Sequence, residues 1–404
     1  MNFLRTLGIA LIVSLAWTGL CRAQSWQPLN NQPTFNATST ALLLTDGTVM
    51  VQDTETPDWW RLTPDANGSY VNGTWSQLAS LPSGYAPIFY ASAVLPDGRV
   101  IIEGGEHNNG IQFAETNLGA IYDPITNSWT SVTPPSGWEN IGDAASVVLD
   151  NGQFMLANNF GPLNDSVALL DPLTLTWSHA GQGKADSNLE EGWTLLPNGQ
   201  VLTVDDNAFV DSNNPSRLTN SELYDPASGK WTSAGSTIVK LDDTNVDGSG
   251  SREIGPAILR PDGTVFATGG TGHNSIYNTA TSTWTPGPDF PNVIEQGQLD
   301  VADGPAALLP SGNVLVATSP GFFMAPTHFF EFDGVNLTEE PAPPRASSSA
   351  SYIERMLLLP TGQVLFTFRI RRMSRSIRPL ELTIPPGLQR FFPLPPQLFP
   401  AAHT

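Results

Sequence analysis

Cysteine is almost absent from this chain of 404 residues, and the single one, Cys21, lies close to the N-terminus. If the chain is cut after Ala23, the remaining protein has no thiol and cannot form a disulfide. Charged residues are also scarce, at 14% of the composition. The stability of the fold must therefore come from the packing of apolar surface.

The first 23 residues have the pattern of an export signal. Arg5 gives a positive start, "TLGIALIVSLAWTGL" is a short apolar core, and "CRA" offers small residues at the cut. We expect residues 1–23 to be a signal peptide, the protein to be secreted, periplasmic or extracellular, and no membrane insertion after cleavage. A membrane anchor and a lipid on Cys21 are the alternatives. The short apolar run and the bulky Leu20 before Cys21 make them less favourable.

Positive charge is scarce in most of the chain. The formal net charge is −20, and six of the 18 Lys and Arg residues lie beyond Phe368. An acidic body repels phosphate groups, which argues against nucleic acid and anionic membranes as partners. We expect a soluble monomer.

One phrase recurs seven times along the chain. In "AVLPDGRVII", "LLPNGQVLTV" and "ILRPDGTVFA", for example, two apolar runs flank a turn that ends in Gly. This pattern predicts a β-hairpin, because Asp-Gly and Asn-Gly tolerate the positive φ of tight hairpin turns. The turn glycines are Gly47, Gly98, Gly152, Gly199, Gly263, Gly312 and Gly362.

A second phrase follows most hairpins, as in "IYDPITNSWTSV" and "LYDPASGKWTSA". One strand ends before an Asp-Pro turn and a Trp begins the next strand, so each unit holds four strands. The Trp residues are Trp75, Trp129, Trp177, Trp231 and Trp284. Hairpins about fifty residues apart, Gly-Gly signals and the Tyr/Trp pair together resemble the kelch repeat, and the resemblance covers roughly residues 25–368.

This resemblance implies an all-β, seven-bladed kelch-type β-propeller over residues 24–368. Trp26 in "SWQPL" begins a strand with no hairpin before it, and the hairpin at Gly362 has no Trp strand after it. We therefore expect the N-terminal strand to complete the last blade and close the ring, which removes exposed sheet edges. Blade six is degenerate, with Leu337 where Trp is expected. The last blade is expected to be incomplete, because no third strand is evident.

Residues 369–404 break the pattern, being basic and rich in proline. They predict an irregular tail. A frameshift in the gene is the alternative, because Arg372–Pro379 can be back-translated and read in another frame as Asp-Val-Glu-Val-Tyr-Thr-Pro. That peptide resembles the missing third strand, and the natural protein would then continue into a further β domain.

Acidic residues precede five of the seven innermost strands, eight to ten residues before the turn glycine. Such carboxylates at the channel mouth would bind a cation or accept hydrogen bonds from sugar hydroxyls, and they would otherwise cap strand ends or face solvent. The expected ligand-binding set is Asp143, Glu191, Glu253, Asp303 and Glu354, with Arg252 and Arg355 beside it.

One loop, "DDTNVDGSGSREI", places oxygen side chains at alternate positions before a glycine. Asp243, Asn245 and Asp247 resemble a calcium loop, although Ile254 stands where the helix-loop-helix version has Glu. A polar turn without metal is the alternative. No catalytic residues are predicted, because the five histidines lack compact metal-ligand spacing and no nucleophile elbow is present.

Two classes of function remain open. The first is a secreted binding or scaffold module for glycan or protein ligands, which the missing catalytic motifs favour. The second is a carbohydrate-active enzyme that uses the channel mouth, similar either to galactose and glyoxal oxidases or to glycosidases. The oxidase resemblance implies copper and a Cys bonded to a Tyr, and a mature chain without cysteine cannot form that radical cofactor.

Overall fold

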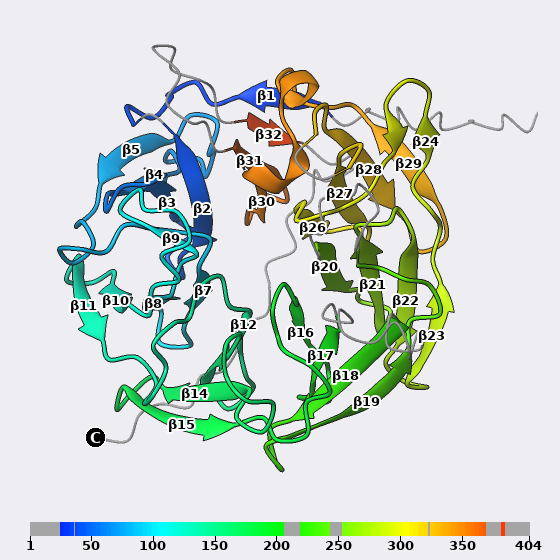
Figure 1. Ribbon diagram of the computed structural model, residues 1–404. Helices are drawn as coiled ribbons and strands as arrows, with labels where there is room; N and C mark the ends of the chain where they lie inside the picture. The colour runs from blue at the N-terminus through cyan, green and yellow to red at the C-terminus, as the bar shows by residue number, and fades with distance from the viewer. Residues whose placement is uncertain are drawn as a thin grey trace, which may run out of the picture.

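The computed structural model describes residues 25–35, 37–205, 219–242, 253–321, 324–368 and 381–383. Within these ranges the protein is a β-propeller with no α-helix, in which four-stranded antiparallel sheets surround a central channel (Figure 1). No helix in this part of the chain is long and apolar enough to cross a membrane. The expected signal peptide, residues 1–23, lies outside the described residues.

Six blades are each built from four strands that follow one another along the chain. In the second blade one short strand, β9 (His107–Asn108), intervenes between the second and third strands. The first has β2 (Thr38–Leu43), β3 (Val49–Asp53), β4 (Trp59–Thr63) and β5 (Thr74–Gln77). The second has β7 (Ala91–Val94), β8 (Val100–Glu103), β10 (Gly119–Asp123) and β11 (Ser128–Val132). The third has β12 (Ser146–Val148), β13 (Phe154–Ala157), β14 (Val167–Asp171) and β15 (Thr176–Ala180).

The other three of these six blades repeat the same order. The fourth has β16 (Trp193–Leu195), β17 (Val201–Val204), β18 (Asn220–Asp225) and β19 (Lys230–Ser236). The fifth has β20 (Ile254–Leu259), β21 (Thr264–Gly269), β22 (Asn274–Asn278) and β23 (Thr283–Pro286). The sixth has β26 (Ala306–Leu308), β27 (Val314–Thr318), β28 (His328–Phe332) and β29 (Leu337–Glu340).

The remaining elements are short. Two small hairpins pair β6 (Pro87–Ile88) with β9 (His107–Asn108) and β24 (Asn292–Val293) with β25 (Gly297–Gln298). Two 3-10 turns, η3 (Ala346–Ser348) and η4 (Ser351–Ile353), precede the last hairpin.

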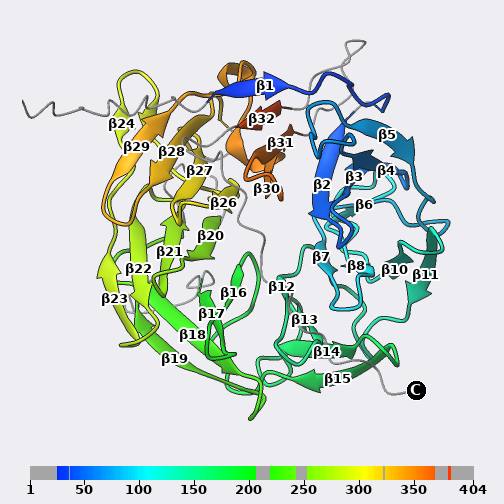
Figure 2. The same ribbon diagram turned by 180° about the vertical axis from the view of Figure 1, so that it is seen from behind.

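A composite sheet joins the two ends of the chain. It has the order β1-β32-β31-β30, with β1 (Trp26–Pro28), β30 (Glu354–Leu358), β31 (Val364–Phe368) and β32 (Glu381–Thr383). Figures 1 and 2 show β1 outermost on this sheet, with β30 facing the channel. The prediction that the N-terminal strand closes the ring is therefore confirmed.

Two sequence-based predictions need correction here. Seven blades were expected, but only six are formed from consecutive strands, and the count reaches seven only if the composite sheet is included. The last sheet was expected to be incomplete, yet β32 supplies its third strand. Its sequence, "ELT", is short and lacks the aromatic residue and Asp-Pro turn that mark third strands elsewhere. Apart from β32, residues 369–404 lie outside the described residues.

The hairpin turns form as the sequence predicts. All seven turn glycines have φ between +79° and +86°, the left-handed region that favours glycine. The expected Trp residues all lie on outermost strands. Tyr122, Tyr224 and Tyr277 each pair with the following Trp, with ring centroids 5.0–5.3 Å apart.

The core lies between neighbouring sheets. Between the first two blades, for example, Met50 and Trp59 pack with Val100, Ile102 and Tyr122 in one buried cluster. The innermost strands contact one another around the ring in the order β2, β7, β12, β16, β20, β26, β30 and back to β2. This packing fixes the residues that precede each innermost strand around one mouth of the channel.

Candidate functional site

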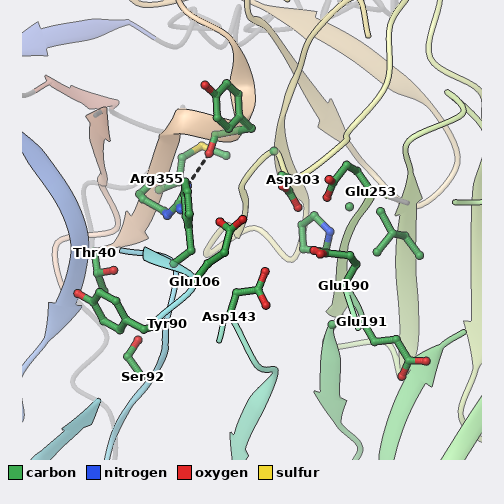
Figure 3. A pocket seen from close by; sticks show the side chains of 18 of the residues that line it. Thr40, Tyr90, Ser92, Glu106, Asp143, Glu190, Glu191, Glu253, Asp303 and Arg355 are labelled. Atoms are coloured by element: carbon green, nitrogen blue, oxygen red, sulfur yellow. Dashed lines mark hydrogen bonds between the residues drawn. The ribbon is translucent and has the colours of Figure 1, made fainter. Parts of the chain in front are cut away.

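A cavity of about 560 Å³ lies at this mouth of the channel. Five acidic residues on separate connecting segments line it: Glu106, Asp143, Glu190, Glu253 and Asp303. Figure 3 shows these side chains gathered around the cavity, with Arg355 and Tyr90 on the opposite side. A cavity of this volume is in the range typical of small-ligand sites.

Three of the acids lie especially close together. One carboxylate oxygen from each of Glu190, Glu253 and Asp303 lies within 4.8 Å of the other two. Glu190 and Asp303 have φ of 62° and 54°, in the left-handed region that non-glycine residues seldom adopt. Such backbone strain is typical of binding and catalytic sites, where the surrounding structure maintains it.

Burial raises the pKa of two carboxyl groups at the cavity, those of Glu190 and Asp143. Burial, followed by the negative charges of Asp143 and Asp303, raises the pKa of Glu190 to about 9. Burial also raises the pKa of Asp143, against a hydrogen bond from Asn159 that lowers it. Glu190 is therefore protonated at neutral pH and can donate a hydrogen bond, whereas an ionised carboxylate can only accept one.

Arg355 is the one basic residue among the described residues that line the cavity. Its Nη1 donates to the backbone oxygens of Tyr352, at 2.9 Å, and Glu354, at 2.7 Å. Its guanidinium also lies 6.0 Å from the ring centroid of Phe89. These contacts hold a positive charge and an aromatic ring beside the acids, an arrangement that can orient a polar ligand.

The structure brings together four of the seven residues proposed from the sequence. Asp143, Glu253, Asp303 and Arg355 all line the cavity. Arg252 lies outside the described residues, as do the proposed calcium ligands Asp243, Asn245 and Asp247.

Glu191 and Glu354 make different contacts from those expected. Glu191 borders the cavity, but its carboxylate points away from it (Figure 3) and contacts Lys184 Nζ at 2.8 Å. Glu354 is fully buried and its Oε1 accepts a hydrogen bond from Thr327 Oγ1 at 3.0 Å. Their neighbours Glu190 and Arg355 line the cavity instead. Arg355 lies on the extended strand β30, where adjacent residues point in opposite directions, whereas Glu190 adopts a left-handed turn with φ of 62°.

Two residues of the site were missed. Glu106 lies in the segment between β8 and β10, not before an innermost strand, so aligning on the turn glycines could not find it. Glu190 was passed over for the adjacent Glu191. A signal for Glu106 was available in the Gly-Gly-Glu-His run, which places a polar side chain directly after a strand.

Glu191 belongs to a second acidic cluster that is filled by a lysine. Lys184 Nζ lies 2.6 Å from Glu222, 3.2 Å from Asp186 and 3.3 Å from Asp205, in addition to its contact with Glu191. The lysine side chain is fully buried and lies over the ring of Trp231. The nearby carboxylates raise the pKa of Lys184, although burial opposes them. Lys184 therefore supplies the cation of this cluster, which has a structural role.

Comparison with known proteins supports the fold. No family model matches the chain. The "Kelch-like protein terF" of Aspergillus terreus is 33% identical over 82 residues, which are 20% of this chain and only 17% of that protein. The sheets described above define the class of protein as a β-propeller, and this match is to a kelch-like protein over that segment alone.

Solved structures show the same architecture at low identity. A fungal alcohol oxidase of the AA5 family, in complex with copper, has a TM-score of 0.58 and 15% identity over 89% of this chain and 76% of its own. A streptogramin B lyase also has a TM-score of 0.58, with 10% identity over 90% of this chain and 98% of its own. The extracellular domain of a two component system from B. thetaiotaomicron has a TM-score of 0.56 and 10% identity over 89% of this chain and 39% of its own. Such identities show the fold alone.

Proposed function

We propose that this chain is a secreted binding module whose acid-lined channel mouth recognises a glycan. The supporting observation is the 560 Å³ cavity in which five acidic side chains face Arg355. Ionised carboxylates accept hydrogen bonds from sugar hydroxyls, while the protonated Glu190 and Arg355 donate to ring or hydroxyl oxygens. Phe89 and Tyr90 add aromatic surface. We also propose that the composite sheet serves as the seventh blade and that the protein is monomeric.

The charge of the mouth restricts the glycan. Acidic side chains line the cavity, and the whole chain is acidic. Uronic acids and sulfated sugars would be repelled, so neutral or amino sugars are the preferred ligands. A protein ligand that presents a basic side chain to the mouth is the variant of this proposal.

A panel of neutral, amino, sulfated and uronic saccharides tests the proposal. We expect neutral or amino sugars to bind and anionic sugars to fail, with binding weakened at least about tenfold in Glu106→Gln or Asp303→Asn, equivalent to about 1.4 kcal/mol. The matched control is Glu139→Gln, an exposed acid in the segment that also carries Asp143. Binding that is equal in all four proteins would place the ligand elsewhere. Calcium and a chelator, added separately, show whether a cation shares the mouth.

Glycoside hydrolysis is a second candidate function, favoured by one observation. A protonated Glu190 lies with carboxylate oxygens of Glu253 and Asp303 within 4.8 Å. Inverting glycosidases separate their two carboxyls by about 6.5–9.5 Å and retaining ones by about 5–5.5 Å. This upper limit of 4.8 Å is nearer to the retaining separation than to the inverting one, so the second candidate is a retaining reaction with Glu190 as the acid and either Glu253 or Asp303 as the nucleophile. Release of nitrophenol from aryl glycosides, lost in Glu190→Gln, would establish it.

Copper-radical oxidation is disfavoured in this proposal. The oxidase resemblance implies a Cys bonded to a Tyr, whereas residues 24–404 contain no cysteine. Copper-dependent release of peroxide by the secreted protein would overturn this part of the proposal.

A further inference from the structure

Away from the channel mouth, three polar side chains form a continuous hydrogen-bonded chain. Ser136 Oγ lies 3.0 Å from His179 Nε2, and His179 Nδ1 lies 2.9 Å from Asp165 Oδ1 and 3.1 Å from its Oδ2. The two ring nitrogens of one imidazole are thus used by a hydroxyl on one side and a carboxylate on the other. This order of contacts is that of a nucleophile, a general base and an orienting acid.

The three residues come from three different segments of the second and third blades. Ser136 lies in the connection from β11 to β12, the segment that also delivers Asp143 to the channel mouth. His179 lies on β15, and Asp165 lies in the loop between β13 and β14. Their approach is set by the fold, because no two of them are close in sequence.

The imidazole and the carboxylate are held in place. The Trp138 ring lies edge-on to His179, with centroids 6.2 Å apart. The Asp165 backbone is fixed by its own N–H, which donates to Pro162 O at 2.8 Å, and by Asn158 Nδ2, which donates to its carbonyl at 3.0 Å. With Asp165 accepting from Nδ1–H, Nε2 is left with the lone pair that can take the proton of Ser136.

The serine lies in a tight turn that exposes it. Trp138 N–H donates to Pro135 O at 3.1 Å, and Gly137 has φ of 79°. Ser136 is exposed to solvent, so a substrate can approach its hydroxyl. The backbone N–H groups of Ser136 and Gly137 take part in no hydrogen bond among the described residues. They are the nearest donors in sequence for an oxyanion formed at the serine.

We propose that Ser136 and His179 are the nucleophile and general base of an ester-hydrolysing site, with Asp165 as a positioning residue. Ser136 Oγ attacks the carbonyl carbon of an acyl ester, and its proton moves to His179 Nε2. The ester C–O bond then breaks, and the alcohol leaves with that proton. Water attacks the acyl-serine through His179 in the same way, which releases the carboxylic acid and restores the serine. The site is open, so the substrate class is a small or surface-presented acyl ester.

Two probes test the site on the whole protein: p-nitrophenyl acetate for turnover and a fluorophosphonate for covalent labelling. We expect the fluorophosphonate to label Ser136 and the ester to be hydrolysed. Ser136→Ala and His179→Gln should each lower kcat by about 100-fold or more, the range of a lost nucleophile or base. Asp165→Asn should lower kcat with KM unchanged and alter the pH–rate profile, which a merely structural residue would not do.

The matched control is Ser228→Ala. Ser228 Oγ donates to the carboxylate of Asp225 at 2.7 Å, and it contacts no histidine among the described residues. This variant should keep full labelling and turnover. The proposal is overturned if Ser136→Ala hydrolyses the ester as fast as the unchanged protein, or if mass spectrometry finds no label on Ser136. Unchanged melting of each variant shows that lost turnover is not lost folding, and the outcome is independent of glycan binding at the mouth.

Discussion

Lys184 Nζ lies 2.8 Å from a carboxylate oxygen of Glu191, and neither side chain is accessible to solvent. This buried pair turns Glu191 away from the channel and leaves the adjacent Glu190 to face it. One residue therefore separates a structural carboxylate from one at the candidate site.

Removing this lysine should destabilise the protein strongly. Lys184→Met would leave the carboxylates of Asp186, Glu191, Asp205 and Glu222 buried without their cation. We expect the free energy of unfolding to fall by about 3–5 kcal/mol in urea at pH 7. Lys230→Met, which removes an exposed lysine, should cost less than about 1 kcal/mol. Equal midpoints for the two variants would show that the buried cluster is not stabilising.

The buried Glu354 should make stability depend on pH. Burial raises its pKa from 4.5 to about 8, against a hydrogen bond from Thr327. Because the folded-state pKa is the higher one, the native state holds the proton more tightly, and stability is lost as pH rises from about 4.5 to 8. Glu354→Gln should therefore be more stable than the unchanged protein at pH 8, by more than about 1 kcal/mol. At pH 4 the stabilities of Glu354→Gln and the unchanged protein should agree. The exposed control Glu295→Gln should match the unchanged protein at pH 4 and at pH 8. A constant difference across pH would contradict the prediction.

Replacement of Glu190 by Gln should leave the affinity for a saccharide unchanged at neutral pH and alter it only at high pH. Since the pKa of Glu190 is raised to about 9, the residue is neutral at pH 7 and Gln is a close neutral substitute. We expect the affinity for a bound saccharide at pH 7 to change by less than about threefold, or about 0.7 kcal/mol. Above pH 9, where only the unchanged protein gains a negative charge, the affinities should diverge. Titration calorimetry from pH 6 to 10 measures the affinities of both proteins. Affinities that change with pH in the same way in both would count against a neutral Glu190.

The short strand β32 should limit the stability of the ring. Only three residue pairs join it to β31 and three to β1, whereas five join β10 to β11. A chain that ends at Phe368 should melt below the full chain, because β1 then has no partner strand. Replacing Arg372–Pro379 with Asp-Val-Glu-Val-Tyr-Thr-Pro should raise the melting temperature above that of the full chain. Identical melting of all three proteins would argue against both expectations.

The repeating parts of the fold could be predicted from the sequence because each blade repeats the same local chemistry. The hairpin turns require glycine at a positive φ, and the Trp of an outermost strand packs on a buried aromatic residue of the strand before it. Both features therefore recur at regular intervals in the sequence. Strand β32 leaves none, since its partners are distant in sequence and its three residues carry no turn signal. The candidate site was predicted only in part, because the positive φ of Glu190 and the buried contact between Glu191 and Lys184 decide which carboxylate faces the channel, and the sequence pattern shows neither.

Amide hydrogen exchange with and without a saccharide from the panel tests the central claim most directly. If the channel mouth is the binding site, protection should appear in residues 40–42, 90–92, 253–256 and 303–304, which border the cavity. Hairpin turns at the opposite ends of the strands, such as that at Gly152, should be unchanged. Protection confined to the outer strands, or no protection by any saccharide of the panel, would contradict the account.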